Sequence, residues 1–320
     1  MGRFFSLLIV CLVAALPAVA HAADDYPNRP IKMIVPISAG SITDVASRLA
    51  AQELQAKLGQ PVVVINKPGA AMVLGGSECA KSDPDGYTLC IVSPDTMSFN
   101  PLTIPDLPYN PDSFIPIIDM YHVVEGLMSP AEDRINTIED LHAKAVAEPG
   151  KLNWGTLGER TTTDAFRQWL GEHWNTKFVA IPFKGGSEIT AALLGNTIDG
   201  AKIGLGNMVS QLNEGKIKLL ALSGSHRWQQ FSGTPTFDEA GFSAYPAGPI
   251  YWGVVVPAGT PAPIVTRLHD ALLGIFQGEK FKNFANQNFL EATAGSTADF
   301  VALLKKDRES AKVLVDKYMK

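Results

Sequence analysis

The sequence predicts an α/β protein of two lobes, each a mostly parallel sheet flanked by helices, with two strands crossing between the lobes. Three observations lead to this fold class. Short β-branched segments alternate with amphipathic segments along the whole chain. About 300 residues remain after a predicted leader, which is enough for two hydrophobic cores. Strand-like segments near residues 120 and 255 are placed where the chain would pass between lobes.

The first 23 residues are expected to form a secretory signal peptide that is removed. A basic start at Arg3 leads into the apolar run Leu7–Leu16 and then into small residues, where Ala18-Val19-Ala20 and Ala20-His21-Ala22 both fit a cleavage site. The mature protein would begin near Ala23 or Asp24. No later segment offers roughly 18 consecutive apolar residues, so no stable membrane insertion is expected.

The first lobe is predicted from alternating strands and helices. Residues 31–37 are a buried strand, residues 45–58 show helical spacing that ends at Gly59, and residues 61–65 are the next strand. A short helix over 73–81 ends at the turn Asp83-Pro84-Asp85-Gly86, before the strand 87–92. The first crossing is expected at about residues 120–128.

The second lobe repeats the alternation. Helices are predicted over 137–147, 164–174 and 188–194, with strands at 152–155, 178–181 and near Ala201 and Leu219. The strand 251–257 returns the chain to the first lobe, and two helices follow, over 263–277 and 297–318. Lobe one therefore comprises residues 24–122 and 257–320, and lobe two comprises residues 123–256. Two crossing strands would act as a hinge about a central cleft.

The composition excludes some partners. The chain is 46% hydrophobic and 18% charged, with a formal net charge of −5 and no block of Lys or Arg. Nucleic acid and anionic membranes are therefore not expected partners. If the ligand is an anion, local geometry must bind it.

Two cysteines remain after removal of the leader, Cys79 late in a predicted helix and Cys90 in the following strand. A disulfide is geometrically possible if their Cβ vectors match, in a compartment where disulfides persist. The favoured interpretation is instead two small buried hydrophobic residues. No Cys or His spacing indicates a metal site, and no cofactor is expected.

Three strand-loop-helix junctions carry the functional prediction. The loops Ser38–Asp44 and Thr156–Asp164 both combine glycine and hydroxyl groups, and both contain a capping-box pattern, Ser41-x-x-Asp44 and Thr161-x-x-Asp164. A third junction, Pro182–Glu188, adds Lys184. Helix N-termini present unpaired N–H groups and the positive end of the helix dipole, which suit a carboxylate. Ordinary capped helices would show the same patterns, but three such junctions favour one anion site outside the carboxyl ends of the strands.

Side chains near these junctions add to the predicted site. Arg160 could grip a carboxylate with both arms of its guanidinium group, although a solvated surface charge is the alternative. Lys184 could add a single contact. Trp154, Phe183 and Trp252 could line the cleft, although such residues more often pack in cores.

Catalysis is not expected. The sequence has no G-x-G-x-x-G opening the first helix, no P-loop, no G-x-S-x-G and no H-E-x-x-H, and its six histidines lack ligand spacing. Asp44 beside Ser41 is better explained by capping than by acid-base chemistry.

The chain resembles the extracytoplasmic receptors of tripartite tricarboxylate transporters, also called the Bug family. The resemblance covers essentially the whole mature protein. It rests on these segments taken in order: Tyr26–Ile31, Pro36–Asp44, Leu58–Val64, Asn66–Ala70, Pro84–Leu89, Asn100-Pro101, Ile181–Gly185, Pro235-Thr236, Glu239–Gly241 and Pro257–Pro261.

The resemblance implies a periplasmic-binding-protein fold of type II, the Venus flytrap, and delivery of a carboxylate to a membrane transporter of one large and one small subunit. It also implies that the first two loops clamp a ligand carboxylate. The family usually has Pro-Gly-Gly where this chain has Ala39-Gly40-Ser41, and small residues where it has Glu159, Arg160 and Asp164. We therefore expect the lobe-one grip to be retained and the lobe-two specificity to be unusual.

The predicted protein is a monomeric periplasmic receptor for a small carboxylate, which it binds reversibly. The expected ligand-binding residues are Ser38, Ala39, Gly40, Ser41, Thr43, Asp44, Ser93, Thr156, Gly158, Arg160, Thr161, Thr162, Lys184 and Gly185. Two alternatives remain at this point. One is a ligand sensor for a membrane signalling partner, and the other is a secreted α/β hydrolase or transferase.

Overall fold

The computed structural model describes residues 26–319 except residues 133, 225 and 247. The predicted signal peptide therefore lies outside the described residues. Within the described ranges, no helix has both the length and the apolar character that crossing a membrane requires.

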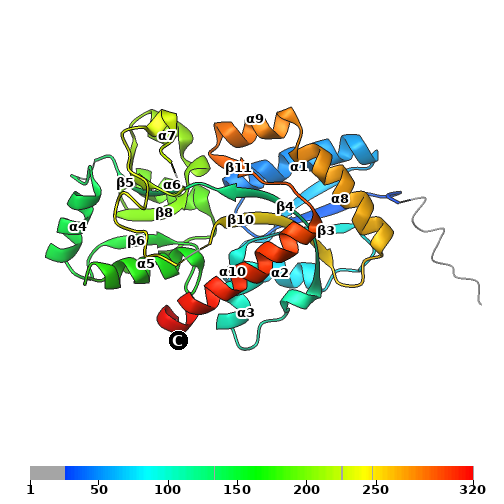
Figure 1. Ribbon diagram of the computed structural model, residues 1–320, viewed down its shortest axis with the longest axis horizontal. Coiled ribbons are helices and arrows are strands. Elements are labelled where there is room, and N and C mark those ends of the chain that lie inside the picture. Colours follow the sequence, from blue (N-terminus) through cyan, green and yellow to red (C-terminus); the bar gives the residue numbers. More distant parts are fainter. Residues whose placement is uncertain (1–25, 133, 225, 247, 320) are drawn as a thin grey trace, which may run out of the picture.

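Lobe one is built on a six-stranded sheet in the order β11-β4-β10-β3-β1-β2 (Figure 1). β1, β2 and β3 are parallel, whereas β10 runs antiparallel to β3 and β4, and β11 antiparallel to β4. The sheet is therefore mixed, because the strands that connect the lobes run against the first three. The strands are β1 (Ile31–Val35), β2 (Val62–Asn66), β3 (Thr88–Val92), β4 (Phe114–Val123), β10 (Ile250–Pro257) and β11 (Leu290–Ala292).

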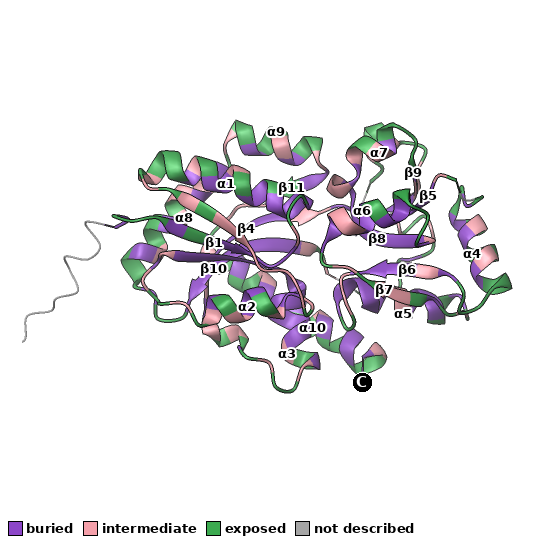
Figure 2. Ribbon diagram, turned by 180° about the vertical axis from the view of Figure 1, so that it is seen from behind, coloured by how far each residue is buried: buried purple, intermediate pink, exposed green. Residues whose placement is uncertain are grey.

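Helices cover both faces of the first sheet. One face packs against α1, α8 and α9 through a large apolar core, and the other packs against α2 and α10. Figure 2 shows the strands buried and the outward sides of these helices exposed. The helices of this lobe are α1 (Ile42–Leu58), α2 (Val73–Ala80), α3 (Asn100–Thr103), α8 (Ala262–Phe276), α9 (Glu279–Gln287) and α10 (Thr297–Tyr318).

Lobe two is built on a five-stranded mixed sheet in the order β7-β6-β8-β5-β9. β6 is parallel to β7 and β8, whereas β5 is antiparallel to β8 and β9. Trp154 and Phe166 lie at the centre of one core, and Ile189 and Leu193 belong to the other. The elements are β5 (Glu125–Pro130), α4 (Ile138–Ala147), β6 (Asn153–Thr156), α5 (Thr162–His173), β7 (Val179–Pro182), α6 (Gly186–Leu194), β8 (Gly200–Gly204), α7 (Val209–Asn213) and β9 (Ile217–Leu222).

The chain passes between the sheets twice. It leaves the first sheet between β4 and β5 at Val124, and it returns between β9 and β10, where the described residues include the short 3-10 turn Gln229–Phe231. β10 pairs with β4 from Ile250 onward, so β10 belongs to the first sheet. Residues 250–256, which were assigned to lobe two from the sequence, therefore lie in lobe one. Among the described residues of this return, none belongs to a strand.

The α/β fold of two lobes follows the predicted order of elements. Helices α7 and α9 and strand β11 were not predicted, and the first crossing, expected at about residues 120–128, consists of two strands, β4 and β5, that begin at Phe114 and Glu125. α9 is short and follows Gly278, which separates it from α8, and β11 has three residues. Such short elements depend on packing against the rest of the lobe, which a local pattern does not reveal.

Cys79 and Cys90 form a disulfide with an S–S distance of 2.07 Å and a Cα–Cα distance of 6.1 Å. The favoured interpretation of two unbonded hydrophobic residues is therefore wrong, although both residues are buried. The bond arises because α2 packs on β3 and brings the two Cβ atoms together. It closes a short loop beside the first sheet.

Removal of this disulfide tests its contribution to stability. The double variant Cys79→Ser/Cys90→Ser should lose about 3 kcal/mol of unfolding free energy, because the open loop gives the unfolded chain more conformational entropy. Urea unfolding monitored by circular dichroism measures the change. Dithiothreitol should lower the midpoint of the wild type and leave that of the variant unchanged; equal midpoints for both proteins without reductant would contradict the prediction.

Candidate functional site

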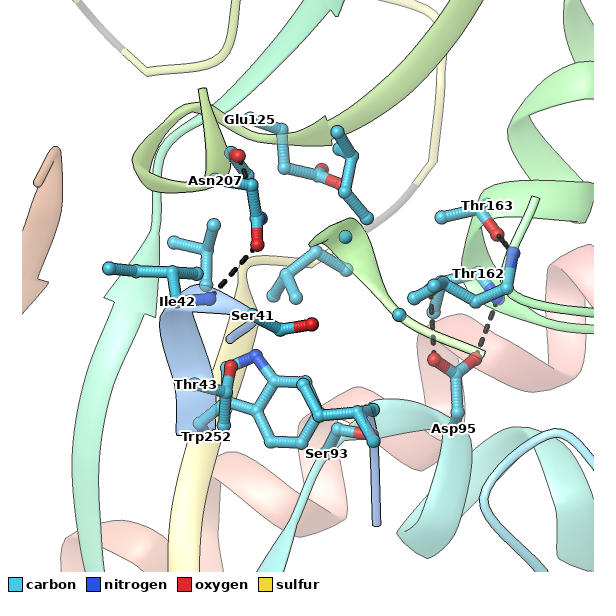
Figure 3. Close-up of a pocket in the computed structure, with 18 residues that line it drawn as sticks. Ser41, Ile42, Thr43, Ser93, Asp95, Glu125, Thr162, Thr163, Asn207 and Trp252 are labelled. Carbon is cyan, nitrogen blue, oxygen red and sulfur yellow. Dashed lines mark hydrogen bonds between the residues drawn. The ribbon is translucent and has the colours of Figure 1, made fainter. Parts of the chain in front are cut away.

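A cavity lies between the two lobes, and Figure 3 shows the residues around it. The volume open to the centres of water molecules is ≈ 40 Å³, which is room for a few waters. A larger solute therefore enters only if the lobes separate. The lining residues are Ile37, Ser41, Ile42, Thr43, Ser93, Asp95, Val123, Glu125, Leu157, Thr162, Thr163, Gly185, Gly186, Ile203, Gly204, Asn207, Ile250 and Trp252.

Three helix N-termini converge on this cavity. α1 contributes Ile42 and Thr43, α5 contributes Thr162 and Thr163, and α6 contributes Gly186. The helices follow β1, β6 and β7, so each begins at the carboxyl end of a parallel strand. The N-termini of all three helices place partial positive charge around one small volume. The structure thus brings together the three junctions that the sequence singled out.

The first turn of α1 does not form the predicted capping box. Ser41 has the extended backbone of an N-cap, but its side chain accepts no capping hydrogen bond. Asp44 instead accepts from the Gly40 N–H at 2.9 Å, from Arg48 Nε at 3.0 Å and from Asn66 Nδ2 at 2.9 Å. Burial opposes ionisation of Asp44, but these donors hold its pKa below the ordinary value. Asp44 fixes the loop, and the Ser41 hydroxyl points into the cavity (Figure 3).

The first turn of α5 forms only half of its predicted capping box. Thr161 Oγ1 accepts from the Asp164 N–H at 3.4 Å, but the Asp164 carboxylate accepts from the Arg160 N–H at 3.1 Å. Asp164 also pairs with Arg167, whose Nε lies 2.7 Å from Oδ1. The loop is therefore held from within lobe two, and the Thr162 amide is left to face lobe one.

Asp95 of lobe one occupies the N-terminus of α5. It lies in a single turn of π-helix, Asp95–Phe99, that follows β3. Its Oδ1 accepts from the Thr162 N–H at 2.7 Å, and its Oδ2 accepts from Thr162 Oγ1 at 3.2 Å (Figure 3). Burial raises the pKa of Asp95 to about 6 despite these hydrogen bonds, and the charges of Asp307 and Glu125 add to the rise.

A second set of contacts closes the lobes at α1 and α6. The Ser38 N–H donates to the Lys184 carbonyl at 3.1 Å, and the Ile42 N–H donates to Asn207 Oδ1 at 2.9 Å. A Cβ at Gly185 would lie 2.1 Å from Ser38 Oγ, and one at Gly186 would lie 2.3 Å from Asn207 Oδ1. Glycine at position 185 therefore lets the lobes approach without displacing the Ser38 side chain, whereas Gly186 makes room for Asn207 within lobe two.

Glu125 and Lys202 form a buried ion pair at the lobe-two side of the cavity. Lys202 Nζ lies 5.1 Å from the centroid of the Phe166 ring and 5.7 Å from that of the Tyr245 ring, so aromatic faces surround the ammonium. Glu125 itself lines the cavity, whereas Lys202 does not. The cavity is thus exposed to the carboxylate end of the pair.

Five of the predicted ligand-binding residues line the cavity: Ser41, Thr43, Ser93, Thr162 and Gly185. Others lie in the loops that shape it without lining it: Ser38, Ala39, Gly40, Asp44, Thr156 and Thr161. Three line a separate outer groove: Gly158, Arg160 and Lys184.

Arg160 does not reach the inner cavity. Its Nη1 donates to the Thr103 carbonyl of lobe one at 3.0 Å, and its backbone has a φ of 62°. The side chain therefore points across the outer groove and links the lobes there. Sequence spacing placed Arg160 in the right loop, but the left-handed backbone at this residue directs it away from the cavity.

The three predicted cleft aromatics have three different positions. Trp252 lines the cavity beside Ser41 and Ser93, as Figure 3 shows. Trp154 is fully buried in the core of lobe two, and Phe183 lines the outer groove.

Sequence reasoning missed Asp95, Glu125 and Asn207. Asp95 follows β3, a parallel strand beside β1, so the rule that ligands sit beyond strand ends could have indicated it. Asn207 follows β8, and Glu125 opens the first strand after the crossing. No motif marks the last two residues, because their roles depend on contacts across the lobes or with a distant strand.

A family model described as "Tripartite tricarboxylate transporter family receptor" matches residues 46–319. A UPF0065 protein encoded in the gbd 5′ region of Cupriavidus necator is 37% identical over 81% of this chain and 78% of its own length. Protein BugT of Bordetella pertussis is 31% identical over 94% of both chains.

Solved structures show the same architecture. The periplasmic binding protein BugD is 27% identical and superposes with a TM-score of 0.86 over 91% of this chain and 98% of its own. R. palustris Rpa4515, solved with adipate, is 26% identical and superposes with the same TM-score and coverage.

The raised pKa of Asp95 predicts a pH dependence of stability. Between pH 3.8 and about 6, the folded protein holds a proton on Asp95 that the unfolded chain has lost. The unfolding free energy of the wild type should therefore fall relative to that of Asp95→Asn as pH rises through this window, and the difference should be constant above it. Urea titrations of both proteins in matched buffers measure the difference. A difference that is flat or rises across the window would refute the assignment.

Proposed function

We propose that this chain, which belongs to the tripartite tricarboxylate transporter receptor family, is a periplasmic receptor that binds a small carboxylate between its lobes and delivers it to a membrane transporter. The observation that carries the proposal is the convergence of three helix N-termini on one cavity that both lobes enclose. Backbone amides and helix dipoles hold a carboxylate without a basic side chain, which agrees with the net charge of −5.

The N-termini of α1 and α6 form the carboxylate cradle in this proposal. The Ser41 hydroxyl and the glycine pair Gly185-Gly186 lie on the lining there, and the missing Cβ atoms leave room for the side chains of Ser38 and Asn207. In the closed molecule, Asn207 Oδ1 accepts the hydrogen bond of the Ile42 amide. A carboxylate oxygen is a chemically equivalent acceptor, so it would replace the Asn207 oxygen when the lobes close on ligand.

Opening and closing of the lobes gives the ligand access. Residues 24–122 and 257–320, with β10, would move against the rest of the chain about Val124 and the segment 223–249. The contacts that join Ser38 to Lys184 and Asp95 to Thr162 would break in the open form. In the closed form, Trp252, Ile37 and Ile203 would cover the apolar part of the ligand.

Family membership supports the delivery step. We propose a partner of one large and one small integral-membrane subunit, a monomeric receptor, and export of the receptor to the periplasm by its N-terminal 23 residues. Adipate in Rpa4515 supports a carboxylate as the ligand class. Binding would be reversible and would leave the ligand unchanged.

Calorimetry on the mature protein tests this function. The panel comprises acetate, succinate, adipate, citrate and benzoate, with the corresponding amides as neutral controls. We expect at least one acid to bind with a dissociation constant of about 10 μM or tighter while its amide does not bind. The proposal fails if no acid binds, or if nuclear magnetic resonance shows that a bound acid is chemically converted.

Substitution of Gly185 tests whether its close contact with Ser38 of lobe one is required for the lobes to close on a ligand. Gly185 has a φ of 173°, which any residue adopts, so Gly185→Ala should fold normally. Its Cβ would collide with Ser38 Oγ and hold the lobes apart, so the affinity for the best acid of the panel should fall at least tenfold. Gly233→Ala is the matched control, because a Cβ at Gly233 meets nothing within 4 Å. Equal affinities of the two variants in calorimetry would show that this contact is not part of closure.

A further inference from the structure

The charged residues that line the inner cavity are all acidic. Two lining residues are acidic, Asp95 and Glu125, and none of the described lining residues is Lys, Arg or His. The basic residues near the cleft, Arg160 and Lys184, line the outer groove instead. A ligand whose only charges are negative would therefore meet two buried carboxyl groups and no basic side chain on this lining.

Asp95 occupies the place that a ligand carboxylate would take at α5. Its two oxygens accept from the backbone amide and the hydroxyl of Thr162, which are the donors that this N-terminus offers. A ligand carboxylate would have to displace a buried side chain of the protein itself. The anionic end of the ligand is therefore directed to α1 and α6, on the other side of the cavity.

Asp95 also lacks a compensating cation. Glu125 is paired with Lys202, whereas no basic side chain in the described part of the chain contacts Asp95. The groups that face it are the hydroxyl of Thr162 and the acidic residues Asp307 and Glu125, and the phenols of Tyr109, Tyr245 and Tyr251 lie near enough to be influenced by its charge. A carboxylate has about four acceptor positions, of which Thr162 fills two. An ammonium group in the cavity would supply both the charge and the donors.

We propose that Asp95 is a specificity-determining residue that makes this receptor select small amino acids over simple carboxylic acids. The inference rests on the proposed function. The ligand carboxylate lies against α1 and α6, and its ammonium group points toward Asp95. At neutral pH a carboxyl group with a pKa of about 6 is mostly ionised, so it attracts an ammonium ion.

Matched pairs of acids test this inference. Calorimetry on the mature wild-type protein compares succinate with aspartate, glutarate with glutamate, and propionate with alanine, each pair differing by one amino group. We expect the amino acid of at least one pair to bind tenfold or more tightly than its partner. Because each comparison is made on one protein, the result does not depend on how any variant folds.

Two variants identify the residue responsible. In Asp95→Asn, the amide oxygen can still accept from the Thr162 N–H and the amide nitrogen can donate to Thr162 Oγ1, so closure is retained while the charge is lost. We expect this variant to lose the preference for the amino acid. Asp307→Asn is the control, because Asp307 is a neighbouring buried carboxyl group that does not line the cavity. It should keep the preference.

The outcomes separate this inference from the proposed function. Equal affinities within every pair, or a preference for the unaminated acid, would overturn the inference and leave the carboxylate receptor intact. Retention of the preference in Asp95→Asn, or an equal loss in Asp307→Asn, would overturn the role of Asp95. Binding of no member of any pair would overturn this inference, whereas the proposed function fails only if the wider panel of acids also shows no binding.

Discussion

The arrangement of the two lobes depends on one constraint: the backbone amides at three helix N-termini require hydrogen-bond acceptors. The first amides of a helix have no partner within it, and here three such ends lie in a closed interface where water is scarce. Lobe one supplies Asp95 to α5, and lobe two supplies Asn207 to α1. Each lobe thus satisfies the other, and a ligand that brings its own acceptor can substitute for part of this arrangement.

The same interface explains why small residues gather at the junctions. Neighbouring side chains leave no room for a Cβ at Gly185 or Gly186. The hydroxyl oxygens of Ser38, Ser41 and Ser187 lie 3.2–3.4 Å from one another. The basic side chains near the cleft, Arg160 and Lys184, line the outer groove instead. The inner cavity therefore offers hydroxyl groups, backbone amides and carboxyl groups, while the outer groove carries the positive charge.

The sequence predicted the order of elements because the cores of both lobes follow regular hydrophobic periodicity, and it predicted the three junctions because strand ends and glycine-rich turns are local features. It failed where two distant segments meet. The disulfide forms only because α2 packs on β3. The carboxylates of Asp44 and Asp164 accept hydrogen bonds from Arg48 and Arg167 and do not complete the predicted capping boxes. Asp95 of lobe one binds Thr162 of lobe two. Arg160 was misplaced because spacing does not reveal a left-handed backbone.

A crystal structure of the mature protein with the acid that binds it most tightly tests the central claim most directly. The ligand carboxylate should lie about 2.7–3.2 Å from Ser41 Oγ and from a backbone amide at the start of α1 or α6, with both lobes in contact with it. An acid bound only in the outer groove beside Arg160, with the inner cavity unchanged, would contradict the account.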